Sequence, residues 1–531
     1  MTRALPHYIT LEDCQIRVWR RGSGPGLIVL PGLALGASVV AERIGEALPG
    51  RTVTVLELPG LGGSISAAAD TLDAAAERLA AACRRLHLDA CALAAFDLTA
   101  PVADRLVGKL DRHPVANIRL GLDRARAWKK RRFLPPHVTP RTDGTHLTAL
   151  WSHIRDCHVI DPSDPGLPAF EGDPLPSGDE LHASFAAAAL SPANFTRLWS
   201  QCLNDIESID AVGVVSVPHL AGLADHLRGV APEAEKASSV PATQALSGGG
   251  IWNDYVELSA GRLHVRRAGT RGRPMLLFPS GGGSAETFTP VIQRLAHTHQ
   301  VVAVDYFGNG DSDKPERNVD IETLAEDARE LADKLGFDSI DLWGSHTGAL
   351  IAIELAVRHP ARIGRAVLEG PVFISSAFQA DLLERYFPRM TPDQWGLHLQ
   401  LFWNWRRDLF MYWPWYRVDY AAARRLGIPE PSDMHRFVMG LLQSGSHYDR
   451  AYRSAYIYRT SDRIRLLQCP SLICAGPNDM LVDGLQEAAK LSPGNVSVML
   501  TPTTAWWPAQ KPDDVEATLA IYERFFAGAP L

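Results

Sequence analysis

The chain has 531 residues, a formal net charge of −7, 46% hydrophobic residues and 21% charged residues. This length exceeds one ordinary hydrophobic core and predicts more than one domain. The acidic balance gives no electrostatic reason to expect nucleic acid or an anionic membrane as a partner. No run approaches the roughly 18 apolar residues of a membrane span.

The seven cysteines are scattered and show no C-x-x-C spacing. This pattern favours reduced thiols over a disulfide scaffold or a zinc site. The first residues, MTRALPHYITLEDC, lack the apolar core of a signal peptide. Together these features predict a cytoplasmic protein.

The two halves of the chain repeat the same segments in the same order. The matching pairs are Tyr8–Gly32 and Tyr255–Ser280, VTVLELPGLGGS and VVAVDYFGNGDS, Arg112–Asp123 and Arg358–Glu369, and Gly222–Asp225 and Gly476–Asp479. We therefore predict a tandem duplication, with a degenerate domain at 1–236, a linker at 237–250 and a second domain at 251–531. The linker is rich in glycine, serine and proline, as flexible connections are.

Strand-like and helix-like segments alternate in each half. In the second half the predicted strands are RLHVRRA, PMLLFPS, QVVAVDY, FDSIDLW, RAVLEGP and PSLICAG, and helical stretches such as Ile321–Leu335 lie between them. This alternation predicts an α/β fold in which each half forms a mostly parallel sheet flanked by helices. Ligand chemistry in such sheets gathers at the carboxyl ends of the strands.

One of these strands runs into the turn Gly344-Ser345-His346-Thr347-Gly348, and the helix-like segment Ala349–Arg358 follows. In the G-x-S-x-G turn the glycines permit a sharp bend, and the middle residue is presented at the start of a helix. Histidine stands here where serine is usual. The turn therefore supports the α/β fold, whereas the histidine at its centre argues against catalysis by a serine nucleophile.

The second half resembles the α/β-hydrolase superfamily over nearly its whole length, and the first half resembles it more faintly. The resemblance is carried by Pro279-Ser280, by Asp305–Ser312, by the elbow Gly344–Gly348 and by the acid Asp479. It implies a helical cap at about 374–465. The late histidine of the family would fall near Ala505, where the chain has none, so no base is placed for a serine hydroxyl.

His346 is the main candidate for chemistry. A neutral imidazole can act as a general base or as a nucleophile that forms an acyl-imidazole. The positive end of the following helix is expected to keep the ring neutral. Asp479 and Glu369 are the two candidate carboxylates that could orient it, and either could also be a capping or ion-pairing group.

Further candidates surround this histidine. The resemblance implies an oxyanion hole made by the backbone N–H groups of Gly281 and Thr347. Ser280 is a candidate substrate contact, and Ser345 is expected to point away from the pocket. Trp403 represents the aromatic-rich cap, which predicts either an apolar pocket wall or a buried helical core.

Three cap histidines, His398, His435 and His447, could supply a displaced base, and their spacing is not that of a metal site. We predict no metal and no cofactor. In the first half the elbow position is Asp97, which is either a carboxylate nucleophile, as in dehalogenases and epoxide hydrolases of the superfamily, or a helix cap in a decayed copy. Its surroundings favour a scaffold role.

Two functions remain from the sequence. The first is a cofactor-independent enzyme that acts on a small apolar or aromatic carbonyl compound through His346. Ester, thioester or carbon–carbon bond hydrolysis are its leading reactions, and a cofactor-free lyase or isomerase activity is the alternative to them. The second is a catalytically silent protein that binds a hydrophobic ligand or a protein partner. Apolar surface in the cap could also serve association of identical chains.

Overall fold

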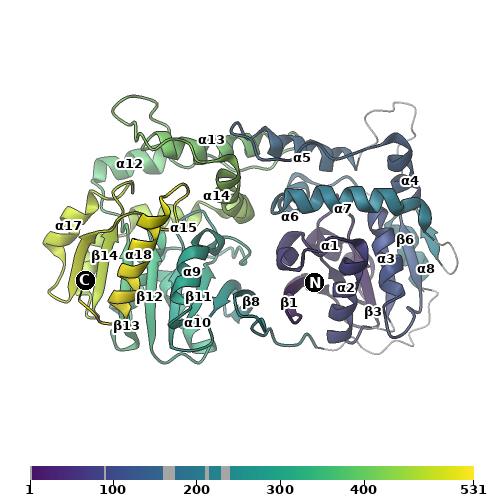
Figure 1. The fold of residues 1–531 in the computed structure, drawn as a ribbon, viewed down its shortest axis with the longest axis horizontal. Coiled ribbons are helices and arrows are strands. Elements are labelled where there is room, and N and C mark those ends of the chain that lie inside the picture. Colours follow the sequence, from purple (N-terminus) through teal and green to yellow (C-terminus); the bar gives the residue numbers. More distant parts are fainter. Residues whose placement is uncertain (1–2, 89–90, 159–173, 210–213, 229–238, 531) are drawn as a thin grey trace. The chain divides into compact units, whose positions relative to one another are not determined.

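The computed structural model describes residues 3–88, 91–158, 174–209, 214–228 and 239–530. The chain divides into two compact units, and each is described by itself (Figure 1). The first unit comprises Met1–Gly248 and Thr391–Gln400, and the second comprises Gly249–Met390 and Leu401–Leu531. Residues 237 and 238 of the predicted linker lie outside the described residues. The first unit thus includes a segment from the predicted cap.

The second unit is built on a sheet of eight strands. They are β8 (Ile251–Leu258), β9 (Gly261–Ala268), β10 (Arg273–Phe278), β11 (His299–Asp305), β12 (Ile340–Ser345), β13 (Ile363–Glu369), β14 (Ser471–Ala475) and β15 (Val496–Leu500). Their order is β15-β14-β13-β12-β10-β11-β9-β8. The strands from β11 to β15 pair in parallel, whereas β8 and β9 pair antiparallel. Central strands such as β14 are buried along their whole length, as in sheets covered on both faces.

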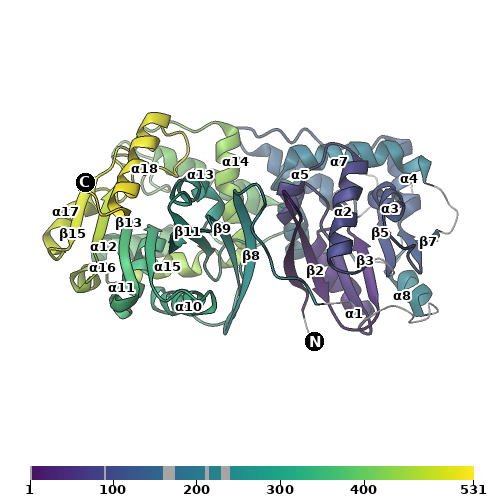
Figure 2. The ribbon, with the colours of Figure 1, turned by 60° about the horizontal axis from the view of Figure 1, so that its bottom comes forward.

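Helices cover this sheet in two layers. They are α9 (Thr289–Leu295), α10 (Ile321–Lys334), α11 (Thr347–Arg358), α17 (Gly484–Leu491) and α18 (Pro512–Phe526). Helix α9 contacts α18, whereas α10 contacts α11 (Figure 2). Helix α10 begins where the Asp320 carboxylate accepts the backbone N–H of Thr323 at 2.8 Å. The apolar sequence of α11 is buried over ten of its residues, which anchors the turn that precedes it.

The cap of the second half lies between β13 and β14. Its helices are α12 (Ser376–Arg385), α13 (Leu397–Met411), α14 (Pro431–Ser444), α15 (Arg450–Ile457) and the short α16 (Thr460–Arg463). Several of its aromatic side chains are fully buried, among them Trp403, Trp405, Tyr386 and Tyr448. Much of the aromatic density therefore forms a helical core.

The first unit repeats the same strand order. Its strands are β1 (Leu5–Thr10), β2 (Gln15–Arg21), β3 (Gly26–Leu30), β4 (Thr52–Leu56), β5 (Ala92–Phe96), β6 (Asn117–Leu120) and β7 (Val215–Val217). Their order, β1-β2-β4-β3-β5-β6-β7, is that of the second unit without its edge strand β15. Its helices are α1 (Ala37–Ala47), α2 (Leu72–Arg85), α3 (Ala100–Val107), α4 (Leu122–Arg131), α5 (Thr145–Asp156), α6 (Gly178–Ala189), α7 (Pro192–Asp205) and α8 (Leu220–Arg228). Helix α1 contacts α8, whereas α2 contacts α3.

Corresponding positions of the two units also make corresponding hydrogen bonds. In the first unit the Arg17 N–H donates to Ser64 Oγ at 2.9 Å, and in the second the His264 N–H donates to Ser312 Oγ at 2.7 Å. Each bond ties the second strand of the sheet to the turn after the strand beside it. The predicted fold class, two α/β units with mostly parallel sheets, is confirmed.

None of the helices in the described ranges combines the length and apolar character needed to cross a membrane. All seven cysteines lie in the described ranges; they are buried and form no disulfide.

Candidate active site

The predicted turn forms between β12 and α11. His346 stands at its centre with φ +49° and ψ −113°, a backbone conformation that residues other than glycine seldom adopt. A Cβ added to Gly344 would lie 2.3 Å from the Gly348 carbonyl oxygen, and one added to Gly348 would lie 2.1 Å from the Phe278 carbonyl oxygen. Both flanking positions therefore require glycine, and the bend aims the His346 side chain away from the sheet.

The imidazole of His346 is bonded to one carboxylate. Its Nε2 lies 3.1 Å and 2.9 Å from the two oxygens of Asp479, which stands in the loop after β14. Asp479 Oδ1 also accepts the Leu481 N–H at 2.8 Å. Asp479 is thus the orienting group for the ring, as the sequence allowed.

Glu369, the other candidate, does not bond the ring with its side chain. Its carboxylate accepts Trp506 Nε1–H at 2.5 Å and the Tyr522 hydroxyl at 2.6 Å. Only its backbone carbonyl meets the elbow, where it accepts the His346 N–H at 2.8 Å. Glu369 therefore supports the elbow through its main chain.

The second ring nitrogen of His346, Nδ1, has no hydrogen-bond partner among the described residues. Nδ1 makes no hydrogen bond within the described part of the chain, and it is not among the polar atoms that are sealed from solvent without a partner. The side chain as a whole is 8% exposed, and the Trp506 ring stands edge-on to it with centroids 5.7 Å apart. Nδ1 is therefore the nitrogen that could meet a ligand.

The carboxylates near His346 act against the expected neutral state of its ring. Burial opposes protonation of His346, but the charge and hydrogen bond of Asp479, with the charge of Glu369, raise its pKa above the ordinary value. Burial likewise opposes ionisation of Asp479, yet the imidazole lowers the pKa of that carboxyl. Burial raises the pKa of Glu369 to about 7. At His346 the two carboxylates thus outweigh the effect of burial on the pKa.

We expect His346 to titrate above an ordinary histidine in the intact protein. Because its folded pKa is raised, the imidazolium–carboxylate pair stabilises the fold fully below the ordinary histidine pKa, and this contribution is lost as the pH rises through the folded pKa. NMR titration of the imidazole nitrogens measures this, with the signal assigned by its loss in His346→Ala. A midpoint below about 6.5, the model-peptide value, would contradict it.

The two proposed oxyanion donors lie side by side. A Cβ added to Gly281 would stand 2.6 Å from Thr347 Oγ1 and 2.5 Å from the Tyr452 ring, so only glycine fits there. Neither the Gly281 N–H nor the Thr347 N–H donates to a partner in the described part of the chain. Two free N–H groups beside the elbow can stabilise an oxyanion.

The other predicted site residues play lesser parts. The Ser280 carbonyl accepts the Tyr306 hydroxyl at 3.1 Å. Ser345 is fully buried, and its Oγ has no partner among the described residues. Trp403 is also fully buried, so it belongs to the core of the cap.

The three cap histidines are not bonded to His346. His398 belongs to the first unit, where its Nε2 lies 3.0 Å from His182 Nδ1, and burial lowers the pKa of His398 to about 3. His435 is buried in α14, and His447 lies in the turn after it. Among the described residues no group of histidine, cysteine and acidic side chains could hold a metal ion.

Asp97 stands at the corresponding elbow of the first unit, also with positive φ, at +43°. Its carboxylate pairs with the Arg124 guanidinium, whose Nη2 lies 2.7 Å and 2.9 Å from its two oxygens. The N-cap residue of the short helix that follows is Phe96, and Asp97 is its first helical residue. A carboxylate held in this ion pair is a weaker nucleophile than a free one.

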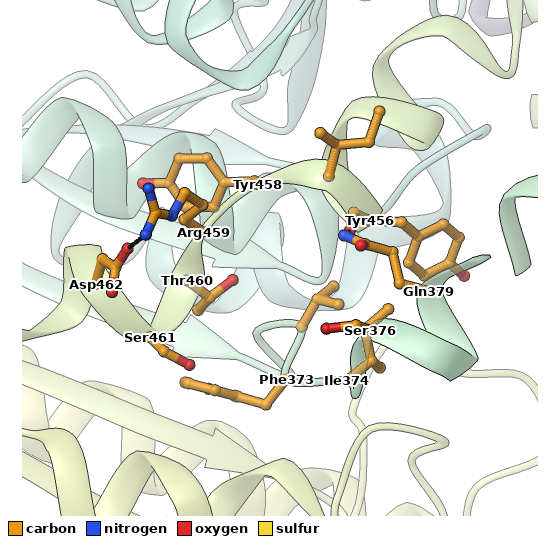
Figure 3. Close-up of a pocket in the computed structure, with 12 residues that line it drawn as sticks. Phe373, Ile374, Ser376, Gln379, Tyr456, Tyr458, Arg459, Thr460, Ser461 and Asp462 are labelled. Carbon is orange, nitrogen blue, oxygen red and sulfur yellow. Dashed lines mark hydrogen bonds and ion pairs between the residues drawn. The ribbon is translucent and has the colours of Figure 1, made fainter.

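A separate pocket opens beyond β13, as Figure 3 shows. Its volume is about 240 Å³, and its wall comes from the residues after β13, the start of α12 and the segment from α15 to α16. Arg459 and Asp462 pair across one side at 2.6 Å. None of the predicted site residues lines it, so it is distinct from the elbow.

Sequence reasoning missed three residues that shape the site. Trp506 and Tyr522 hold the Glu369 carboxylate. Gly370, with φ +57°, lets the His346 ring lie against the backbone, because an added Cβ would stand 2.5 Å from its Cδ2. A signal existed for Trp506, since Ala505-Trp506-Trp507 occupies the place of the family's late histidine.

Comparisons with known proteins agree with this fold. Residues 273–501 match the family model described as the alpha/beta hydrolase fold. The matched residues run from the start of β10 to the end of β15 in the second unit, so this unit is similar to that family, as the resemblance in the sequence implied.

Curated relatives match over shorter stretches. A soluble epoxide hydrolase of Corynebacterium sp. (strain C12) is 37% identical over 95 residues, which cover 18% of this chain and 33% of the relative. An uncharacterized hydrolase of Bacillus subtilis (strain 168) is 29% identical over 126 residues, which cover 23% of this chain and 46% of the relative. The chain thus spans less than half the length of these relatives. Among solved structures, the enol-lactonase from Burkholderia xenovorans LB400 aligns with a TM-score of 0.41 and 19% identity, covering 51% of this chain and 99% of that one.

Proposed function

We propose that the second unit is a cofactor-independent enzyme of the α/β-hydrolase type that hydrolyses a small apolar or aromatic carbonyl compound, with His346 as its working group. One observation carries the proposal. The His346 imidazole sits on a strained elbow, with Nε2 bonded to Asp479, Nδ1 unpaired and two free N–H groups beside it. Strain of this kind concentrates at functional sites.

The chemistry runs through Nδ1 of the neutral ring. As a general base, Nδ1 takes a proton from the water that attacks the substrate carbonyl, and Asp479 stabilises the resulting imidazolium. As a nucleophile, Nδ1 attacks the carbonyl carbon of an ester or thioester and expels the alcohol or thiol, and water then cleaves the acyl-imidazole to the acid and the free ring. In both cases the N–H groups of Gly281 and Thr347 hold the oxyanion. Because the pKa of His346 is raised, activity is expected to increase with pH through that pKa.

The test compares wild type and His346→Ala on a panel of 4-nitrophenyl esters and thioesters, with mass spectrometry of the protein after mixing. Turnover that depends on His346 supports the proposal. An acyl adduct on His346 selects the nucleophile, and turnover without an adduct selects the base. Equal rates in both proteins would exclude His346.

A catalytically silent protein that binds a hydrophobic ligand is the second candidate. It is favoured by the absence of a histidine at Ala505 and by the engagement of His346 Nε2 with both oxygens of Asp479. Absence of turnover across the panel, together with saturable binding of the same compounds, would select it.

We also infer that the two units arose by tandem duplication and that the first serves as a scaffold. Supporting this are the common strand order and the positive φ at both elbows. The Glu57–Arg17 pair of the first unit also corresponds to the Asp305–His264 pair of the second. The scaffold role follows from Asp97, whose charge Arg124 neutralises.

Gly370→Ala is expected to lower the proposed ester turnover by about 10²-fold, because a displacement near 1 Å at a catalytic group costs about that much. The new methyl group would lie 2.5 Å from His346 Cδ2 and 2.8 Å from Nε2, and must push the ring from Asp479. Gly336→Ala is the matched control, since Gly336 has φ +71° and no atom within 4 Å of an added Cβ. Both variants carry the strain of a positive φ, about 1 kcal/mol. Steady-state kinetics and thermal unfolding of the two variants make the comparison; equal loss of turnover in both would show that strain alone is responsible.

A further inference from the structure

Helix α13 carries two consecutive arginines in different environments. Arg407 is 31% exposed at its side chain and lies 4.0 Å from Asp408. Arg406 is only 4% exposed, and its Nη2 donates to the Gly282 carbonyl at 2.8 Å. No carboxylate of the described residues forms an ion pair with Arg406.

The surroundings of Arg406 supply no negative charge. Its guanidinium lies 4.6 Å from the Phe437 ring centroid and 5.2 Å from that of Trp405. Its titratable neighbours are the phenols of four tyrosines, Tyr452, Tyr386, Tyr448 and Tyr306. Burial raises the pKa of Tyr386, Tyr448 and Tyr306 far above their ordinary value, so these phenols stay neutral.

An arginine keeps its charge when buried, and a buried charge without a counter-ion is costly. Burial lowers the pKa of Arg406, as expected for a charge that lacks compensation. The isolated protein therefore holds one uncompensated positive charge inside the cap.

One terminal nitrogen of this guanidinium, Nη1, is available to a ligand. Nε is sealed and has no partner among the described residues. Nη1 makes no hydrogen bond there either, and it is not among the sealed atoms. The guanidinium lies at the loop that holds Gly281, because its Nη2 donates to the carbonyl of the next residue, Gly282, at 2.8 Å.

We propose that Arg406 binds a carboxylate of the substrate, so that the enzyme acts on carbonyl compounds that carry one negative charge. This inference rests on the function proposed above. A planar guanidinium matches a carboxylate, and the single positive charge among aromatic rings suits a monoanion rather than a phosphate dianion. Consecutive Cα atoms are about 3.8 Å apart, so the carboxylate would lie only a few bonds from the reacting carbonyl at Gly281.

The kinetic test uses 4-nitrophenyl hemisuccinate and its uncharged methyl ester. Wild type is expected to prefer the charged ester by about 10- to 100-fold in kcat/KM, the range for a charged hydrogen bond. Arg406→Met should abolish this preference, and the neighbouring Arg407→Met should retain it. An equal rate with both esters in wild type, or a preference that survives in Arg406→Met, would overturn the proposal. A merely structural role for Arg406 would lower both rates alike.

A binding test separates this proposal from the catalytic one. Calorimetry in the His346→Ala background compares 3-phenylpropanoate with 3-phenylpropanamide, which differ in charge. Binding of the acid at least about 10-fold tighter than the amide supports the carboxylate site even if no ester is turned over. Equal affinities would overturn it, whatever the activity. Should Arg406→Met fail to fold, the preference between the two esters is measured in Arg406→Lys. The difference in affinity between acid and amide in the His346→Ala protein then decides whether the carboxylate site exists.

Discussion

His346→Ala is expected to lower kcat/KM for 4-nitrophenyl ester hydrolysis by about 10³-fold, the range for removing a positioned base. The reason is geometric. His346 Nδ1 is unpaired and stands at the elbow beside the free N–H groups of Gly281 and Thr347. The oxyanion donors would survive the substitution, so a small residual rate should remain.

The matched control is His297→Ala, because His297 is an exposed histidine of the same unit. Stopped-flow absorbance at 4-nitrophenolate wavelengths measures both variants against wild type. Retention of wild-type kcat/KM in His346→Ala would remove the ring from the mechanism. A comparable loss in His297→Ala would point instead to a general effect on folding.

Asp479→Asn should be nearly as harmful, with an expected loss of about 10³-fold. Asp479 holds His346 by Nε2 at 2.9 Å and fixes the proton on that nitrogen, which leaves Nδ1 as the acceptor. An asparagine amide can present N–H to Nε2 and so impose the wrong tautomer. The substitution also removes the charge that raises the pKa of His346. The pH profile of the residual activity should therefore shift to lower pH.

Asp483→Asn is the control, since Asp483 is exposed four residues later and its side chain caps no helix. Measuring kcat/KM from acidic to alkaline pH in both variants tests the rate and the shift together. An unchanged midpoint in Asp479→Asn would show that the carboxylate does not set the protonation of the ring.

Strands β9 to β14 of the second unit could be predicted from sequence, because most of them are short apolar runs bounded by turn residues, whereas the mixed sequence of β8 gave no such signal. The predicted PSLICAG contains β14 (Ser471–Ala475), and the predicted helix Ile321–Leu335 corresponds to α10. Strand β15 escaped notice because it sits at the sheet edge, where its residues are only partly buried and the apolar pattern is weak. The assignment of Thr391–Gln400 to the first unit also carries no local signal, since it depends on contacts far apart in sequence.

At the site, the sequence indicated the elbow and two acids but could not choose between them. The choice depends on side-chain direction, which places Asp479 on the ring and turns Glu369 to Trp506 and Tyr522. Arg406 was invisible for a similar reason. In the sequence Arg406 and Arg407 look like two arginines that both face solvent. Which of them is buried depends on which face of helix α13 packs against the rest of the protein.

The alanine at position 505 constrains how this domain could evolve. Thr504 approaches Asp479 at 3.5 Å and Trp506 stands against His346, so Ala505 lies beside the very carboxylate that a late imidazole would need. His346→Ser alone would leave Asp479 with no imidazole to orient. Ala505→His alone would give two imidazoles, those of residues 346 and 505, that compete for Asp479. Serine catalysis at this elbow would therefore require both exchanges at once.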